Sequence, residues 1–262
     1  MTVNLSANEQ RALLSVQDIT KRFGAVSALR GVSFDVFPGE IVAVVGDNGA
    51  GKSTTIKMIS GVEQPDEGQI LFDGQKVALN GPSVAEKLGI QTVYQDLALC
   101  DNLDIVSNLY LGRELSRPML PGKLRVLNRP LMEQQALPVL RELGINLPPL
   151  STPVASLSGG QRQTVAVARA VLWGSKLVML DEPTAALGVA QTRAVLELVK
   201  KLGKSGVGVL VISHNLSDVF EIADRIVVLR LGRTIAQFKK SEVKPEQVVG
   251  AITGVMEEVS QG

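Results

Sequence analysis

Residues 46–54 read GDNGAGKST and have the residue types of a phosphate-binding loop. The glycines allow the backbone to curl so that its N–H groups point inward, at a helix start where negative charge is favoured. Lys52 is expected to reach the β- and γ-phosphates of a nucleotide, and Ser53 to hold Mg²⁺. The expected nucleotide contacts in this loop are Gly46, Asp47, Asn48, Gly49, Ala50, Gly51, Lys52, Ser53 and Thr54.

The sequence on both sides of the loop argues against a chance match. The apolar run of residues 41–45 comes before it, and Ile56, Met58 and Ile59 follow at helical spacing. The loop therefore lies between a buried strand and a helix, which is the context that a phosphate loop requires. A phosphate loop alone leaves kinases, GTPases and motor ATPases open.

A second apolar strand ends in two carboxylates, within residues 177–184 (LVMLDEPT). In a parallel sheet, ligands bind at the carboxyl edge, so Asp181 would lie beside the phosphate loop and anchor the Mg²⁺ shell. Glu182 would polarise a water molecule aimed at the γ-phosphate. The alternative is a strand that simply stops at an acidic turn before Pro183. The phosphate loop favours the functional interpretation.

Residues 157–161 (LSGGQ) stand immediately before an expected helix over residues 162–172. Ser158 is a suitable N-cap, and the glycines leave the first N–H groups open, which predicts a second anion-binding helix start. The alternative is a flexible linker. Since nothing else suggests two nucleotides, we expect two chains to pair isologously, each offering this segment to the other's phosphate loop. The expected contacts are Ser158, Gly159, Gly160 and Gln161.

Two further polar residues follow expected strands. Gln95 follows residues 90–94, and His214 follows residues 207–212, so both should reach the same sheet edge as Asp181. A lone histidine can be a satisfied surface or core group. Because His214 is the only histidine and lies at this edge, we expect it to contact the γ-phosphate.

The order of elements predicts an α/β protein with a mostly parallel core sheet. Residues 14–37 alternate as antiparallel strands, residues 99–154 form an inserted, mainly helical subdomain with a loop at 116–122, and helix and strand then alternate. Residues 225–229 and 234–238 are a closing strand pair. The expected organisation is a flexible segment at 1–13, one domain over 14–250 and a tail at 251–262.

Composition excludes several classes. The hydrophobic content is 45% and the mean hydropathy is +0.20, but the longest apolar runs are far shorter than the roughly 20 residues of a spanning helix. The first residues lack a secretory pattern, which predicts a cytoplasmic location. The net charge of +1 argues against a nucleic-acid partner. Cys100, the only cysteine, excludes an internal disulfide.

Together these motifs resemble the ATP-binding subunit of an ABC transporter, over about residues 14–250. The resemblance makes residues 46–54 the Walker A loop, residues 177–182 the Walker B strand with Glu182 as catalytic base, residues 157–161 the signature and His214 the switch histidine. It makes Gln95 the glutamine that senses Mg²⁺ and water and links the site to a transmembrane partner. Phe23 stands where the family has an aromatic that stacks on adenine.

One position departs from the family. The loop after the Walker B strand usually carries an Asp that helps to couple two sites across a dimer, and this chain has Gly188 there. A glycine makes no carboxylate contact, so coupling through this loop is in doubt. The segments NLYLGRE, TAALGV and SHNLSDVFEIADRIVVLRLGR are similar to monosaccharide importers of the ribose, xylose and fructose type. Many of those carry two such domains, whereas this chain has one.

The resemblance implies an ATPase that uses ATP and Mg²⁺, forms a homodimer and binds transmembrane permease subunits, with a sugar-binding protein as an indirect partner. It implies a peripheral location on the cytoplasmic face of the cell membrane and sugar import, of the fructose type among single-domain members. Two alternatives are a soluble ABC-type ATPase of DNA repair or translation and a non-hydrolysing, nucleotide-gated module. The first alternative would be expected to show a long coiled coil, zinc cysteines or tandem domains, and none is seen in this sequence. Only Gly188 supports the second alternative.

Overall fold

A computed structural model describes residues 11–120 and 124–255 of the chain. Its centre is a six-stranded sheet with the order β12-β11-β3-β10-β9-β6. All of these strands are parallel except β12, which pairs antiparallel with β11 at one edge. The strands are β3 (Ile41–Val45), β6 (Ile90–Val93), β9 (Leu177–Asp181), β10 (Gly208–Ile212), β11 (Arg225–Arg230) and β12 (Arg233–Lys239).

Every residue of β3 and β10 is buried, because helices or a second sheet cover both faces of the central sheet. This burial explains the continuous apolar runs of the sequence. Val42, Met179 and Leu210 point to one face, while Val178, Val209 and other alternate residues point to the opposite face. The carboxyl ends of these strands share one edge of the sheet, as the sequence predicted.

A four-stranded antiparallel sheet with the order β2-β1-β4-β5 packs on the first face. Its strands are β1 (Leu14–Phe23), β2 (Val26–Val36), β4 (Glu67–Phe72) and β5 (Gln75–Val77). Its buried side chains, such as Val16 and Phe34, share one core with Ile56 and Met58 of α1 (Lys52–Ile59). α2 (Pro82–Leu88) completes this layer.

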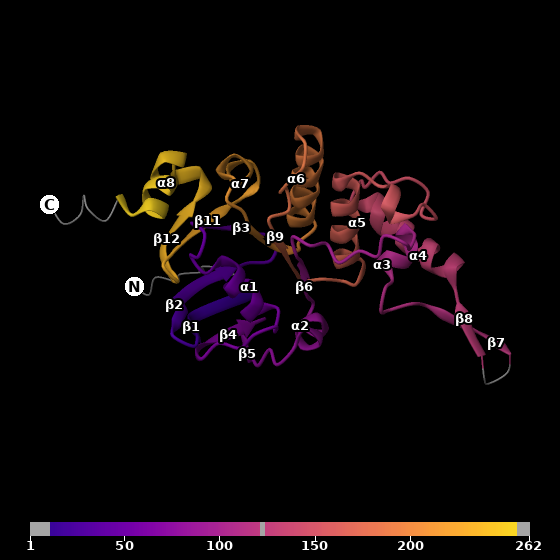
Figure 1. Ribbon diagram of the computed structural model, residues 1–262, viewed down its shortest axis with the longest axis horizontal. Helices are drawn as coiled ribbons and strands as arrows, with labels where there is room; N and C mark the ends of the chain where they lie inside the picture. The colour runs from indigo at the N-terminus through magenta and orange to yellow at the C-terminus, as the bar shows by residue number, and fades with distance from the viewer. Residues whose placement is uncertain (1–10, 121–123, 256–262) are drawn as a thin grey trace, which may run out of the picture.

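The opposite face is covered by α5 (Gly159–Leu172) and α6 (Val189–Lys204), and by α7 (Leu216–Ile222) and α8 (Pro245–Thr253) towards β11. Figure 1 shows these four helices side by side above the central sheet. Two short 3-10 helices are η1 (Val154–Ser156) and η2 (Lys240–Glu242). No helix in the described part of the chain is long and apolar enough to cross a membrane.

The inserted helices, α3 (Ile105–Leu109) and α4 (Arg129–Glu142), pack with α5 around a core of their own. Asn108 is fully buried in this unit and donates to the carbonyl oxygens of Cys100, Leu103 and Asp104. A buried amide needs partners for its N–H groups, and these three carbonyl oxygens provide them. The bonds therefore hold residues 100–104, where the chain enters the subdomain, against α3. The α/β fold with an antiparallel sheet and an inserted helical subdomain is thus confirmed.

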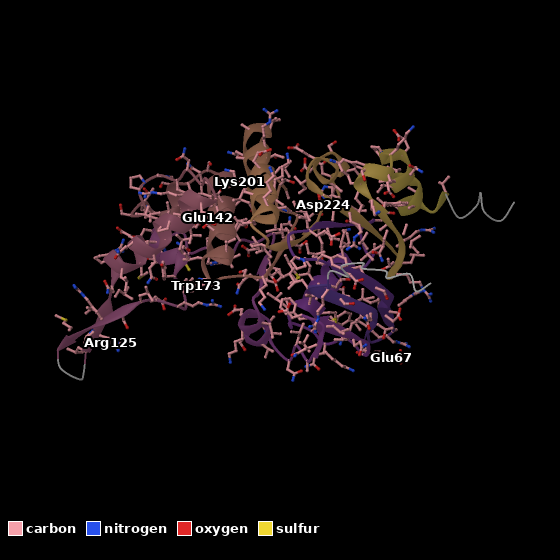
Figure 2. The ribbon with its side chains drawn as sticks, turned by 180° about the vertical axis from the view of Figure 1, so that it is seen from behind. Glu67, Arg125, Glu142, Trp173, Lys201 and Asp224 are labelled. Carbon is pink, nitrogen blue, oxygen red and sulfur yellow. The ribbon has the colours of Figure 1, made fainter. Side chains whose placement is uncertain are left out.

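The prediction of a loop over residues 116–122 is wrong for residues 116–120, and residues 121–122 lie outside the described residues. β7 (Ser116–Leu120) and β8 (Leu124–Leu127) form an antiparallel hairpin there. Pro118 suggested a loop, but each strand of a two-stranded sheet has a free edge where a missing N–H breaks no ladder bond. The hairpin projects from the end of the helical subdomain, and Arg125 lies on it (Figures 1 and 2).

The two expected terminal segments fall partly outside the described residues, which omit residues 1–10 and 256–262. Leu13 is 4% exposed, and its N–H donates to the Val36 carbonyl oxygen at 2.9 Å. At the other end, α8 runs across position 250, where the sequence suggested the start of a tail. Its Val248 and Ala251 are buried against β11 and β3.

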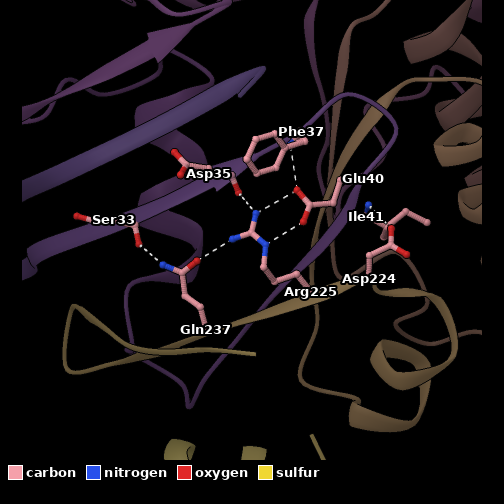
Figure 3. A network of polar contacts seen from close by, with 8 residues as sticks. All are labelled: Ser33, Asp35, Phe37, Glu40, Ile41, Asp224, Arg225 and Gln237. Carbon is pink, nitrogen blue, oxygen red and sulfur yellow. Dashed lines mark hydrogen bonds and ion pairs between the residues drawn. The ribbon is translucent and has the colours of Figure 1, made fainter. Parts of the chain in front are cut away.

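Arg225 of β11 links the central sheet to the four-stranded sheet (Figure 3). It does so at Glu40, directly before β3, the strand that leads into the phosphate loop. Its guanidinium makes a bidentate pair with Glu40, at 2.8 and 3.0 Å, and donates to the Asp35 carbonyl oxygen of β2 at 2.6 Å. A further N–H donates to Gln237 of β12 at 2.7 Å. Bidentate arginine pairs fix orientation as well as distance, so this contact fixes the position of β3.

Candidate functional site

The phosphate loop joins β3 to α1, between the strand and the helix that the sequence predicted. Gly46, Gly49 and Gly51 have φ values of 152°, 82° and 104°. A Cβ atom on Gly46 would lie 2.1 Å from the Leu229 carbonyl oxygen, and one on Gly51 would lie 2.7 Å from Leu29 Cδ2. No side chain caps α1, so its first N–H groups remain available to a phosphate.

Lys52, the first residue of α1, is buried and lies against the loop itself. Its Nζ donates to the carbonyl oxygens of Gly46 at 2.7 Å and Asp47 at 3.0 Å. Burial lowers the pKa of Lys52, while the negative charges of Glu182, Asp47 and Asp181 oppose that shift. The ammonium group is therefore held inside the loop, in the place where a phosphate could accept from it.

Two carboxylates follow β9 at the same sheet edge. Asp181 is the last residue of β9 and pairs with Ile212 of β10. Burial, and secondly the charge of Glu182, raise the pKa of Asp181, while Lys52 opposes the shift. These mutual effects show that the ammonium group and the two carboxylates belong to one electrostatic site. The charges were expected to meet here, because β3 and β9 both end at this edge.

Glu182 and His214 form a direct pair. His214 Nδ1 lies 2.9 Å from Glu182 Oε2, and their side chains are 72% and 16% exposed. A carboxylate accepts only, so this ring nitrogen carries the hydrogen. Glu182 has a φ of 51°, and its N–H donates to the Ile212 carbonyl oxygen at 2.9 Å. The left-handed backbone and this bond turn the carboxylate toward the histidine.

The expected Mg²⁺ ligands provide oxygen donors from three elements: Ser53 from α1, Asp181 from β9 and Gln95 from the segment after β6. Hydroxyl, carboxylate and amide oxygens are the donor types that Mg²⁺ prefers, so these residues fit that ion. The described residues contain no group of three or more His, Cys, Asp or Glu side chains that could hold a metal. Mg²⁺ commonly completes its shell with substrate phosphates and water.

The signature segment begins α5 in the helical subdomain. Ser158 is the N-cap; its Oγ accepts from the Gln161 N–H at 3.3 Å, and Gln161 Oε1 accepts from the Ser158 N–H at 2.9 Å. Gly160 is buried, and a Cβ atom there would lie 2.8 Å from Gln191 Cβ of α6. Ser158 and Gly159 are exposed. No hydrogen bond or ion pair among the described residues joins this segment to the phosphate loop.

Phe23, the expected adenine contact, is the last residue of β1 and is 43% exposed. Lys21 Nζ lies 5.6 Å from the centre of its ring. The ring is therefore accessible for stacking. Gly188, at the position where the family usually has Asp, is the N-cap of α6 and is exposed, with a φ of −74°. A Cβ atom on it would meet nothing within 4 Å.

Two features of this region were missed by the sequence interpretation. A cavity of about 390 Å³ lies beside the phosphate loop and is lined partly by Ile252 and Thr253 of α8. Thr184 Oγ1 donates to Asp218 Oδ2 at 2.6 Å and ties the segment after β9 to α7. Asp218 is only 8% exposed. Neither the cavity nor this hydrogen bond has a local sequence signal, because each involves elements that are far apart in the chain.

Comparisons with known proteins agree with this geometry. Residues 29–185 match the family model described as ABC transporter. The chain is 48% identical to a xylose/arabinose import ATP-binding protein of Sulfolobus acidocaldarius, across 92% of this chain and 94% of that protein. It is also 48% identical to a fructose import ATP-binding protein of Rhizobium meliloti, across 95% and 96% of the two chains. A ribose import ATP-binding protein of Rubrobacter xylanophilus is 41% identical over 91% of this chain, which spans 46% of that relative.

Solved structures resemble the whole described fold. An ATP-binding cassette of an ABC transporter in its ADP conformation superposes with a TM-score of 0.78 and 26% identity, across 93% of this chain and 95% of that one. A dimeric bacterial ABC transporter cassette superposes with a TM-score of 0.71 and 26% identity, across 87% and 98%. The family match and these relatives confirm the resemblance drawn from the motifs. The chain belongs to the ABC transporter family, in which it is an ATP-binding cassette.

Proposed function

We propose that this chain is the ATP-hydrolysing subunit of an ABC importer for a monosaccharide. The observation that carries the proposal is the cluster of Lys52, Asp181, Glu182 and His214 at the end of the phosphate loop. The names of the relatives support a sugar such as xylose, arabinose, fructose or ribose. The xylose/arabinose and fructose relatives are matched over 94% and 96% of their lengths at the same identity, so xylose, arabinose and fructose are the first candidates.

In this mechanism the open N–H groups of α1 and the Lys52 ammonium bind the phosphates of ATP. Phe23 supports the adenine. Glu182 accepts a proton from the attacking water, and His214, hydrogen-bonded to Glu182, fixes the carboxylate and contacts the γ-phosphate. Ser53, Asp181 and Gln95 would hold Mg²⁺, which neutralises phosphate charge when bound. Catalysis is mainly positioning and charge stabilisation.

The signature segment completes the site of a second copy. Ser158, Gly159, Gly160 and Gln161 begin a helix that no hydrogen bond or ion pair connects to the chain's own phosphate loop in the described residues. A relative forms a dimeric cassette, which supports a homodimer here. ATP held between two chains then closes the dimer, and hydrolysis reopens it. Permease subunits, which receive sugar from a sugar-binding protein, would be moved by this closing and opening on the cytoplasmic face of the membrane.

The test is Glu182→Gln, which keeps the size of the side chain but removes its basicity. Phosphate release from ATP should fall by at least about 100-fold, the usual contribution of a general base, while ATP binding and ATP-dependent dimerisation remain. In cells that lack the native gene, the wild-type chain should restore uptake of labelled fructose, ribose or xylose, and the variant should not. If the variant released phosphate as fast as the wild type, Glu182 would not be the catalytic base. If the wild-type chain also failed to restore uptake, sugar import would be refuted.

A further inference from the structure

The hairpin β7–β8 is the one described element pair that stands apart from every packed layer. Its two strands pair with each other and make no extensive contact with another helix or strand. It projects from the end of the helical subdomain, with Arg125 on the projecting part (Figures 1 and 2). An isolated two-stranded hairpin is only marginally stable in water. Its ordered strands therefore point to a partner surface outside the chain.

The side chains of the hairpin are unusually apolar for a solvated surface. Met119 is 65% exposed, Leu124 is 55% exposed and Leu127 is 52% exposed. Scattered single apolar residues are normal on protein surfaces, but three occur within these two short strands, with Met119 and Leu124 towards one end and Leu127 opposite Ser116 at the other. Met119 precedes and Leu124 follows residues 121–123, which lie outside the described residues, so both apolar side chains lie near the described ends of the two strands.

The charges of the hairpin are all of one sign. No Asp or Glu occurs from Ser116 to Leu127, whereas Arg117 and Arg125 are both exposed. Arg125 donates to the hydroxyl and carbonyl oxygens of Ser116 and forms no ion pair with a carboxylate in the described part of the chain. The side chain of Arg117 makes no hydrogen bond or ion pair with any described residue. No described carboxylate therefore compensates the charges of Arg117 and Arg125.

The two arginines that flank the hairpin differ from the two on it, because both flanking arginines are paired with a carboxylate. Arg113 forms an ion pair with Glu86 at 2.8 Å and lies 5.0 Å above the ring of Trp173. Arg129 is paired with Asp104. The chain thus neutralises its cations at the base of the hairpin and leaves them unpaired on the hairpin itself. An anionic partner is the complement of that pattern.

We propose that the hairpin β7–β8 binds the surface of a bilayer that contains anionic lipids. Met119 and Leu124 enter the boundary between head groups and acyl chains, and Arg117 and Arg125 meet the lipid phosphates. The spacing fits: Arg117 lies two residues behind Met119, which is about 7 Å along a strand. Interfacial apolar groups are buried roughly 5–10 Å deep, which places the guanidinium at the level of the phosphates.

A lipid surface suits this element better than a protein or a nucleic acid. A stable protein interface needs about 800 Å² on each partner, more than two strands of five and four residues offer. The hairpin sequence has no aromatic side chain on which a base could stack. A lipid surface needs only apolar groups and positive charge. The proposal does not depend on the ATPase cycle, so it can be tested on the purified chain without nucleotide.

A fluorescent probe tests which part of the chain meets lipid. In a Cys100→Ser background, Met119→Cys carries an environment-sensitive fluorophore, and Leu231→Cys on the turn between β11 and β12 is the matched control. Leu231 is 69% exposed, similar to Met119. Vesicles of phosphatidylcholine with one third phosphatidylglycerol should shift the emission of the first probe to the blue and leave the second unchanged. No shift at position 119, or equal shifts at both positions, would overturn the proposal.

Charge variants test the role of the arginines. Each basic residue near an anionic surface contributes about 1 kcal/mol, so Arg117→Gln should weaken vesicle binding about fivefold at low salt. Lys76→Gln, at an exposed position of β5, should not change it. Equal binding to pure phosphatidylcholine would contradict the proposal. So would a Met119→Ser, Leu124→Ser variant that binds vesicles normally but no longer co-purifies with membrane subunits, because the partner would then be a protein.

Discussion

The molecule has two glycine-rich helix starts, and they use their first N–H groups differently. At α1 the N-cap is Gly51, with a φ of 104°, and no side chain caps the helix. At α5 the N-cap Ser158 and Gln161 cap each other reciprocally. The first helix start is open to an external anion, whereas the second already satisfies part of its own donors.

The charges around the two helix starts differ in the same way. Lys52, Asp181 and Glu182 influence one another at α1. In the first turn of α5, Arg162 donates to the Leu157 and Ala155 carbonyl oxygens and forms an ion pair with Asp101 at 3.5 Å. Similar glycine-rich sequences therefore serve different purposes. In the proposed function, the phosphate loop holds a nucleotide, and the signature completes a site on another chain.

The largest expected effect comes from Gly46→Ala, at the first residue of the phosphate loop that leads into α1. Its Cβ atom would lie 2.1 Å from the Leu229 carbonyl oxygen, so β11 or the loop must move. We expect a loss of about 3 kcal/mol or more in the free energy of unfolding, measured by urea denaturation. The matched control is Gly159→Ala at the other helix start, where the nearest atom is a flexible Leu187 methyl at 3.2 Å. It should stay within about 1 kcal/mol of wild type, and equal losses in both variants would contradict the comparison.

A smaller effect is expected from Asp104→Ala in the subdomain that carries the signature. Asp104 caps α3 by accepting from the Ser107 N–H at 2.9 Å and also pairs with Arg129 of α4. Loss of the cap should lower the free energy of unfolding by about 1 kcal/mol. α3 packs on α5, so signature-dependent hydrolysis should fall while nucleotide binding by a single chain persists.

The contribution of Asp104 should also depend on pH. Burial alone would raise the pKa of Asp104, but the hydrogen bonds from Ser107 and the bond and charge of Arg129 outweigh it, so the pKa is lowered. A carboxyl with a lowered pKa in the folded state stabilises the fold above its ordinary pKa, and this stabilisation is lost as the pH falls through the folded value. Wild type and Asp104→Ala should therefore converge in stability in strong acid. A constant difference between pH 7 and strong acid would contradict this.

The smallest effect on stability is expected from Gly188→Asp, which restores the residue type that the family usually has. Gly188 is exposed, has an ordinary φ and has open space around its Cβ position. Aspartate is also a good N-cap. Stability should change by less than about 0.5 kcal/mol. Any change in the cooperativity of ATP hydrolysis then reports on coupling between the two sites, and a large loss of stability would refute this account of the loop.

Much of the nucleotide side of the molecule could be predicted from the sequence, because its signals are local. The phosphate loop, the strand that ends at Asp181 and the capped start of α5 each depend on neighbouring residues in the chain. The common sheet edge followed from the alternation of strands and helices. The expected closing strand pair is present, and the Gly232 N–H between its strands donates to the Ala50 carbonyl oxygen of the phosphate loop at 3.1 Å.

The remaining features depend on contacts between distant segments. The 2.9 Å pair of Glu182 and His214 requires β9 and β10 to be neighbours and Glu182 to adopt a left-handed backbone. The cavity wall from α8 follows from the path of the chain after β12. The hairpin β7–β8 was hidden by Pro118, which is tolerated on a free strand edge.

The central claim is that each site combines the phosphate loop of one chain with the signature of another. Lys52→Ala should inactivate the first part and Ser158→Arg the second, so each variant alone should release almost no phosphate from ATP. When the two variants are mixed in equal amounts, half of the dimers are mixed, and each mixed dimer has one intact composite site. Activity should recover to about a quarter of the wild-type value if the sites act independently. No recovery on mixing, with mixed dimers demonstrated, would contradict the account.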